Sequence, residues 1–239
     1  MATKTIAFFG ASTGVGLSAL RNTLAAGHRC IALCRTPSTL TNVLPLSSNP
    51  NLTVVAGNAH DIEAASQCLK KEDGTFVDAI VFSIGAKFVG LTIDDPEVCR
   101  KGMAVLLEAV SQLRQHDVAG RPRILVCSTT GISRTGRDLP LLMLPLYYLT
   151  MKVPHADKKA MELALEQSGE DFTIVRCSLF MGGETDTTIR VGVEDPKSGR
   201  ESVAIGYTIS REDAGKWFAE HLIKTNGGRF LNKIATITY

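Results

Sequence analysis

The chain has 239 residues, of which 44% are hydrophobic and 21% charged, and its formal net charge is +2. This length and composition are enough to bury the core of one soluble α/β domain. The nearly balanced charge predicts no nucleic-acid partner and no attraction to an anionic membrane surface, and no apolar stretch reaches the roughly 20 residues of a membrane span.

Cysteine usage and the amino-terminal residues predict a cytoplasmic protein. The six cysteines are scattered through mostly apolar runs, none forms a C-x-x-C pair, and no metal site is expected. The first predicted strand begins at Thr5, which leaves no room for a targeting segment. The oligomeric state stays open.

The predicted elements begin with one βαβ unit. Residues 5–9 form an apolar run closed by Gly10, residues 14–26 follow as a helix that Gly27 ends, and residues 30–34 are the next apolar run.

The alternation of strand and helix then continues to the end of the chain. Further strands are predicted at 52–56, 79–83, 124–128 and 173–177, and further helices at 62–69, 96–115 and 154–167. Residues 210–213 read as a capping box that opens a last helix to Lys224, and residues 234–238 are predicted as an additional edge strand.

These elements predict a single doubly wound Rossmann domain over residues 1–239, with a mainly parallel sheet and a small C-terminal extension on the substrate side. Continuously apolar strands such as 79–82 suit a parallel sheet that is covered on both faces. Two segments interrupt the alternation, 129–153 and 180–209, and both are predicted as long loops. Because both follow strands at the edge where such sheets bind ligands, we expect them to wall a substrate pocket.

A glycine-rich phosphate loop lies between the first strand and the first helix. Gly10 permits a tight turn, Gly14 lets the backbone approach a pyrophosphate, and Gly16 allows the helix to pack on the sheet. The free N–H groups and positive dipole of the helix N-terminus attract phosphate, and the Ser12 and Thr13 hydroxyls can add donors. The predicted cofactor-binding residues of this loop are Gly10, Ala11, Ser12, Thr13, Gly14, Val15 and Gly16.

Arg35, at the end of the second strand, indicates NADP(H) as the cofactor. NAD-specific sites usually place an acidic residue near this position for the ribose hydroxyls, and no Asp or Glu lies between Gly27 and Val55. The planar guanidinium suits the 2′-phosphate of NADP(H). The alternative is a solvated surface arginine.

Six motifs are spread over nearly the whole chain: GASTGVG at 10–16, ALCRTP at 32–37, VVAGNAHD at 54–61, KKAME at 158–162, SGEDFTIVR at 168–176 and ISREDA at 209–214. Together they resemble the atypical short-chain dehydrogenase/reductases, in particular the NAD(P)-binding group that includes the NmrA-like proteins and the flavin-reductase type of biliverdin reductase. The resemblance specifies fold and cofactor better than reaction.

The resemblance implies further contacts along the cofactor. It places Asn58 near the adenine, where the family often has an aspartate, and Ser128 facing the substrate. Ser83, Ile84 and Gly85 would pass beneath the ribose. Ser178 and Leu179 lie in the turn that meets the nicotinamide amide, although the usual proline of that turn is missing.

Three alternatives remain for the proton chemistry. Lys158, followed by Glu162, matches the lysine of the family, where it would hold the nicotinamide ribose, but Pro154 then occupies the tyrosine position. A second arrangement is Tyr148-x-x-x-Lys152, one turn apart on a helix and so on one face, in which the phenol protonates a carbonyl oxygen. His155, near its switch point at neutral pH, is a third acid/base candidate.

The sequence therefore predicts an NADP(H)-dependent oxidoreductase that passes hydride to an apolar ketone, quinone or flavin-like acceptor. The apolar run 139–148 is the reason for the acceptor's character. Two alternatives stay open: a non-catalytic dinucleotide-sensing regulator of the NmrA-like kind, and a redox-neutral isomerase on the same scaffold.

Overall fold

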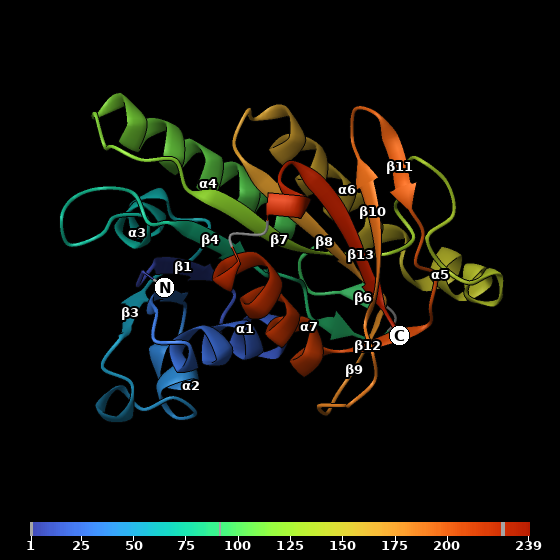
Figure 1. Cartoon of the computed structure of the whole chain (residues 1–239), viewed down its shortest axis with the longest axis horizontal. Helices are drawn as coiled ribbons and strands as arrows, with labels where there is room; N and C mark the ends of the chain where they lie inside the picture. Colours follow the sequence, from blue (N-terminus) through green and yellow to red (C-terminus); the bar gives the residue numbers. More distant parts are fainter. Residues whose placement is uncertain (1, 91, 226–227) are drawn as a thin grey trace.

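The computed structural model describes residues 2–90, 92–225 and 228–239. Within these residues nine strands form one sheet in the order β11-β10-β13-β8-β7-β4-β1-β2-β3 (Figure 1). The strands from β13 to β3 in that order are parallel. Strand β10 pairs antiparallel with β13, and β11 pairs antiparallel with β10. The nine strands are β1 (Thr5–Phe9), β2 (Arg29–Cys34), β3 (Leu52–Ala56), β4 (Ala79–Phe82), β7 (Arg123–Thr129), β8 (Phe172–Cys177), β10 (Arg190–Asp195), β11 (Gly199–Ser202) and β13 (Lys233–Thr238).

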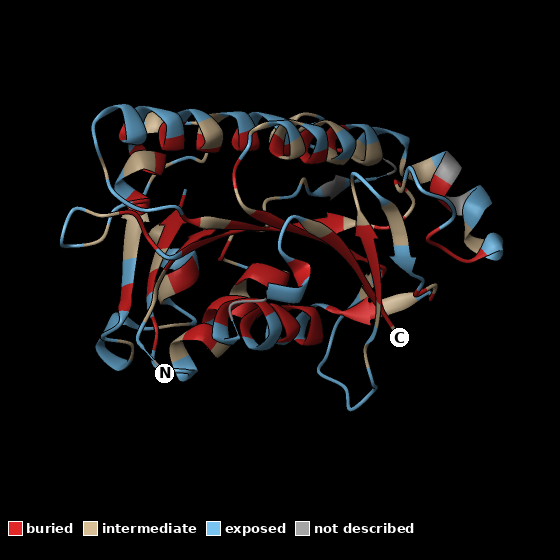
Figure 2. Cartoon of the chain, turned by 45° about the horizontal axis from the view of Figure 1, so that its top comes forward, coloured by how far each residue is buried: buried red, intermediate tan, exposed pale blue. Residues whose placement is uncertain are grey.

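Helices cover both faces of this sheet, which Figure 2 shows as a buried layer between two helical layers. On one face lie α1 (Gly14–Ala25) and α7 (Arg211–Trp217), the latter continuing as a π-helical segment over Phe218–Lys224. The other face carries α3 (Ile62–Cys68), α4 (Val98–Gln115) and α6 (Lys152–Gln167).

Smaller elements lie at the periphery. The short helices are α2 (Pro37–Thr41) and α5 (Leu144–Thr150), and short 3-10 turns occupy Leu46–Ser48, Leu141–Met143 and Gly228–Phe230. Strand β9 (Leu179–Met181) pairs parallel with β12 (Thr208–Ser210), and β5 (Phe88–Val89) pairs antiparallel with β6 (Thr92–Ile93).

The strand sequences reflect this double cover. Phe8 and Phe9 are adjacent in β1 and point to opposite faces, yet both are fully buried, one in each hydrophobic cluster. A strand buried on both faces has no polar face, which explains the continuous apolar runs. The predicted α/β fold with a mainly parallel sheet is confirmed. None of the helices in the described ranges is both long and apolar enough to cross a membrane.

Two predictions about the last third of the chain are wrong. Residues 234–238 do not form an edge strand, because β13 lies inside the sheet between β8 and β10. Residues 180–209 are not only loop, because they contain β10 and β11, most of β9 and the start of β12. The buried stretch Gly192, Val193 and Glu194 is too short and polar to be recognised as a strand, and its pairing with β13 decides its conformation.

The strand order creates a topological switch point between β1 and β4. Strand β1 connects through α1 to β2 on one side, and pairs with β4 on the other. Ligands of doubly wound sheets bind outside the carboxyl ends of the strands at such a point. Gly10 and Ser83 follow these two strands directly.

Candidate functional site

The phosphate loop has the geometry that the glycine spacing predicts. Gly10 and Gly14 have φ values of +90° and +59°, which side chains with a Cβ atom rarely adopt. A Cβ atom on Gly10 would lie 2.8 Å from the carbonyl carbon of Ser83, and one on Gly16 would overlap the Gly10 carbonyl oxygen and the Ser83 hydroxyl. The backbone of the loop is therefore closely packed against the end of β4.

The N-terminus of α1 has no side-chain cap. Thr13 occupies the cap position with an extended backbone but makes no capping hydrogen bond, and the first turn carries no acidic residue. By contrast, Asp61 caps α3 and Ser210 caps α7 through their side chains. The first amides of α1 are thus left to an external acceptor, and a phosphate group is one that suits them.

The predicted adenine-side residues lie next to this loop. The Ser12 hydroxyl contacts the Cys34 sulfur at 3.6 Å, and Arg35 follows Cys34 as an exposed residue. Asn58, beyond β3, is exposed, and its side-chain oxygen accepts a hydrogen bond from the His60 amide at 3.2 Å. Arg35 directly follows β2, and Asn58 lies two residues beyond β3. Both residues are therefore at the carboxyl ends of neighbouring strands, on the same side of the switch point.

Lys158 joins the carboxyl ends of two strands. Its ammonium donates hydrogen bonds to the Ile84 carbonyl at 2.9 Å and the Cys127 carbonyl at 2.8 Å. Burial disfavours the ammonium, but Cys99, Cys127 and Asp157 outweigh burial and raise the pKa of Lys158. The side chain is therefore a fixed cation beside the segment Ser83, Ile84 and Gly85, held by the two carbonyls and by Cys99.

Two buried hydroxyls with no partner lie at the ends of the neighbouring strands. Ser128 and Ser178 are each 2% exposed, and within the described residues neither hydroxyl oxygen has a hydrogen-bond partner. Buried polar groups are usually paired, so such atoms at a sheet edge indicate a missing ligand. Together with the glycine cradle and the uncapped helix, these hydroxyls fit a dinucleotide across the carboxyl edge of the sheet. Leu179, next to Ser178, is partly exposed there.

A cleft of about 900 Å³ opens beyond the end of β7. It begins at Gly131, three residues after Ser128 along the chain, and its other walls come from α5 and the first turns of α6. Its lining combines an apolar wall with several charged groups: Gly131, Ser133, Gly136, Arg137, Asp138, Leu139, Leu144, Pro145, Tyr147, Lys152, His155, Ala156 and Lys159.

Tyr147 and His155 pack together in this cleft. Their ring centroids are 5.5 Å apart. Burial raises the pKa of Tyr147, with Thr130 opposing the shift and Asp138 adding to it, so the phenol keeps its proton at neutral pH. Burial, with Lys159, lowers the pKa of His155 from 6.5 to about 4. The expectation that His155 titrates near neutral pH is therefore wrong, and its ring is neutral there.

The predicted Tyr148–Lys152 pair does not lie on one helix. Helix α5 ends at Thr150, α6 begins at Lys152, and Met151 separates them with ψ near 2°. The assumption of a shared helix face is therefore wrong. Lys152 lines the cleft, whereas the side chain of Tyr148 lies outside what the structure describes.

Sequence reasoning missed Tyr147. It is adjacent to Tyr148 in the same apolar run and lies eight residues before His155. Because α5 and α6 are separated at Met151, helical spacing could not have predicted the contact between Tyr147 and His155.

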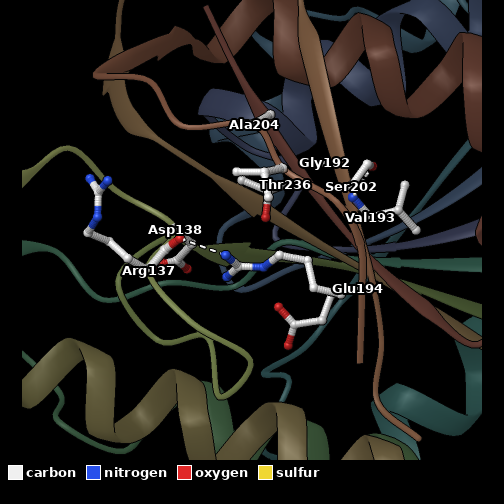
Figure 3. Close-up of a pocket in the computed structure, with 10 residues that line it drawn as sticks. Arg137, Asp138, Gly192, Val193, Glu194, Ser202, Ala204 and Thr236 are labelled. Atoms are coloured by element: carbon white, nitrogen blue, oxygen red, sulfur yellow. Dashed lines mark hydrogen bonds between the residues drawn. The ribbon is translucent and has the colours of Figure 1, made fainter. Parts of the chain in front are cut away.

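The missed hairpin of β10 and β11 supports the wall of the cleft. Arg200 of β11 donates hydrogen bonds to the carbonyl oxygens of Arg137 at 3.0 Å and Gly136 at 2.7 Å. Figure 3 shows Arg137 and Asp138 across from Glu194 of β10. Ser133 donates to Glu194 of β10 at 2.7 Å. The hairpin thereby holds the segment after β7 in place.

A buried ion network anchors this hairpin to α6. Arg176 is 1% exposed and donates to Glu162 of α6 at 2.7 and 3.2 Å and to Glu194 at 3.1 Å. Because the guanidinium pairs with two carboxylates, the charge in this buried position is compensated. The network fixes α6, β8 and β10 relative to one another around the cleft.

Comparisons with known proteins show the family to which the chain belongs. A family model described as NAD(P)H-binding matches residues 10–224. The reductase pytE of Aspergillus terreus is 40% identical, with 98% of each chain covered, and the oxidase pynE of Aspergillus niger is 32% identical over 100% of this chain and 99% of its own. The chain therefore belongs to the NAD(P)H-binding family, and its relatives are named as redox enzymes.

Solved structures show the same fold at low identity. A short-chain dehydrogenase/reductase from Veillonella parvula in complex with NADP superposes with a TM-score of 0.76, at 13% identity, over 100% of this chain and 95% of its own. The anaerobillin reductase ChuY from Escherichia coli O157:H7 gives a TM-score of 0.66, at 13% identity, over 98% of this chain and 96% of its own. The resemblance to the atypical short-chain dehydrogenase/reductases is thus confirmed for the fold and the NAD(P)H-binding domain.

Proposed function

We propose that this protein is an NADP(H)-dependent reductase that transfers hydride to an apolar ketone, quinone or flavin-like acceptor. The observation that carries the proposal is the cleft of about 900 Å³ that begins three residues after Ser128. Its volume lies in the range of small-molecule sites, and its wall of Leu139, Leu144, Pro145 and Tyr147 suits an apolar ring system.

The side chains around the cleft supply the remaining chemistry. The bound cofactor would supply the hydride, and the acceptor oxygen or nitrogen then takes one proton. Tyr147 is a protonated phenol in the cleft wall and donates that proton, which solvent replaces through the open side. Ser128 offers a hydrogen bond to the same oxygen, and the Lys158 cation holds the ribose side of the cofactor.

Arg35 supports NADP(H) over NAD(H) in this proposal. It is exposed at the end of β2, and the absence of Asp and Glu between Gly27 and Val55 leaves the 2′-hydroxyl without a local carboxylate partner. An arginine fork binds phosphate through paired hydrogen bonds. We expect NADPH to bind about tenfold or more tightly than NADH, ~1.4 kcal/mol.

Calorimetric titration with each cofactor tests the preference, and Arg35→Ala should remove it without changing NADH affinity. Equal affinities in the unaltered protein would contradict the NADP(H) assignment. NADPH oxidation is then followed against a panel of quinones, flavins and cyclic ketones. Turnover with a member of the panel supports the reductase, whereas tight NADPH binding without oxidation by any member favours a dinucleotide sensor.

A further inference from the structure

The phosphate loop carries no charged side chain of its own, yet a cation from a distant part of the chain lies against it. Arg211 is the first residue of α7, almost 200 positions after the loop. Its Cδ and Nε atoms are 3.4 and 4.0 Å from the position that a Cβ atom on Gly14 would occupy. We propose that Arg211 binds the pyrophosphate of the cofactor and links the two halves of the dinucleotide site.

The position of Arg211 follows from the packing of α7 on α1. A Cβ atom on Gly215 would overlap the Ser18 side chain, so the two helices approach at backbone distance. The Ser18 hydroxyl donates to the Glu212 carbonyl at 2.6 Å, which ties the first turn of α7 to α1. Figure 1 shows α7 alongside α1, with β9 and β12 next to them.

The far end of the side chain reaches the nicotinamide half of the site. The guanidinium carbon lies 5.3 Å from the centre of the Phe180 ring, and one N–H group donates to the Met181 carbonyl at 3.2 Å. Both residues belong to β9, directly after Ser178 and Leu179. Arg211 therefore spans from the phosphate loop to the turn beyond β8, and a dinucleotide at this edge has its pyrophosphate between those segments.

Its charge and exposure suit an anion. Arg211 is exposed, and among the described residues its remaining N–H donors have no hydrogen-bond partner. Its acidic neighbours are engaged elsewhere: Glu212 accepts from Ser210, and Asp213 accepts from Thr185. The guanidinium and the uncapped N-terminus of α1 thus present positive potential to the same region.

The location of Arg211 is unfavourable for its own helix. A cation in the first turn opposes the helix dipole, and acidic residues are preferred there. A residue that breaks a local rule in this way often serves a ligand. A bound pyrophosphate removes the conflict, because it places negative charge beside both the guanidinium and the helix ends.

This inference rests on the cofactor half of the proposed function and not on the acceptor. The proposed role of Arg211 differs from that of Arg35 in a measurable way. The pyrophosphate is common to NADPH and NADH, so loss of Arg211 should weaken both cofactors by the same factor. Loss of Arg35 should weaken NADPH alone.

The test measures NADPH and NADH dissociation constants by fluorescence titration, without acceptor, for Arg211→Ala and the uncharged Arg211→Gln. We expect each variant to bind both cofactors about tenfold or more weakly, with an unchanged NADPH to NADH ratio. The wild-type affinity should also fall more steeply with salt than that of the variants. Arg229→Ala is the matched control, because Arg229 also lies over a phenylalanine ring, 5.4 Å from the centre of Phe230, but precedes β13 at the amino edge of the sheet.

Affinities within twofold of the wild type would overturn the proposal, as would a loss confined to NADPH, which would place Arg211 at the 2′-phosphate. A loss of the same size in Arg229→Ala would show a general charge effect and would also overturn it. Unfolding midpoints are measured for all variants. Weak binding by Arg211→Gln at a wild-type midpoint supports a direct contact, and weak binding that only follows a lowered midpoint contradicts it.

Discussion

Replacing Lys158 with methionine should reduce both stability and cofactor affinity. Methionine keeps an unbranched apolar side chain, one heavy atom shorter than lysine, but removes the two hydrogen bonds to the Ile84 and Cys127 carbonyls, at 2.9 and 2.8 Å. A hydrogen bond from a charged donor contributes about 1.5–3 kcal/mol. The relief of ammonium desolvation offsets part of this loss, so we expect the free energy of unfolding to fall by about 2–4 kcal/mol.

Trp217 provides the probe for this measurement. It is the single tryptophan of the chain and is buried in the core beside α7, so its fluorescence reports unfolding in urea. Lys159→Met is the matched control, because Lys159 is the next residue of α6 and is exposed. The control should change the free energy of unfolding by about 0.5 kcal/mol or less.

The same variant should bind NADPH about tenfold more weakly, because the ends of β4 and β7 lose their link beside the proposed ribose site. A free energy of unfolding within about 0.5 kcal/mol of the wild type would refute the structural role of the ammonium. The stabilisation by the Lys158 ammonium should be lost at high pH. Because the pKa of Lys158 is raised, the contribution is present below its unfolded value of 10.5 and is lost as the pH rises through the folded value.

Three further predictions concern the loop and the cleft. Gly14→Val should abolish NADPH binding with a native circular dichroism spectrum, because a valine side chain at φ +59° would stand where phosphate approaches, and normal binding would disprove the loop placement. Tyr147→Phe should lower kcat by about 100-fold with little change in NADPH affinity, whereas Tyr148→Phe should not; the reverse result would return the proton donor to Tyr148. The pKa of His155 is lowered from 6.5 to about 4 in the folded protein. As the pH falls, this histidine is therefore protonated in the unfolded chain before it is protonated in the folded protein. The free energy of unfolding should therefore fall between about pH 6.5 and 4, by roughly 1–2 kcal/mol after allowance for partial exposure, and a His155→Gln variant that shows the same fall would exclude this origin.

The fold and the geometry of the glycine loop could be predicted because their signals are local. Gly10, Gly14 and Gly16 of the phosphate loop lie within seven consecutive residues. Strand β1 ends directly before the loop, and helix α1 begins at Gly14. Apolar runs identify strands that are buried on both faces, such as β4, without knowledge of their neighbours. Arg35 directly follows one of these strands.

The substrate half could not be predicted in the same way, because its elements depend on contacts between distant segments. Strand β10 has a buried charged residue, Glu194, which is stabilised by pairing with β13, the ion pair with Arg176 and the hydrogen bond from Ser133. The break at Met151 separates Tyr148 from Lys152, although their spacing fits one helical turn. The neighbouring Tyr147 instead packs against His155.

Sequence by itself determined the alternation of strands and helices, the cofactor loop and the capping box that begins α7, since each depends on residues within a few positions of one another. Tertiary structure alone decided that Lys158 bonds the ends of two strands, that β13 lies inside the sheet, and that Arg211 lies against Gly14. The physical reason is the same for all three. Side-chain periodicity records which face of an element is buried, whereas the partner that buries it is chosen by the packing of the whole sheet and its helices.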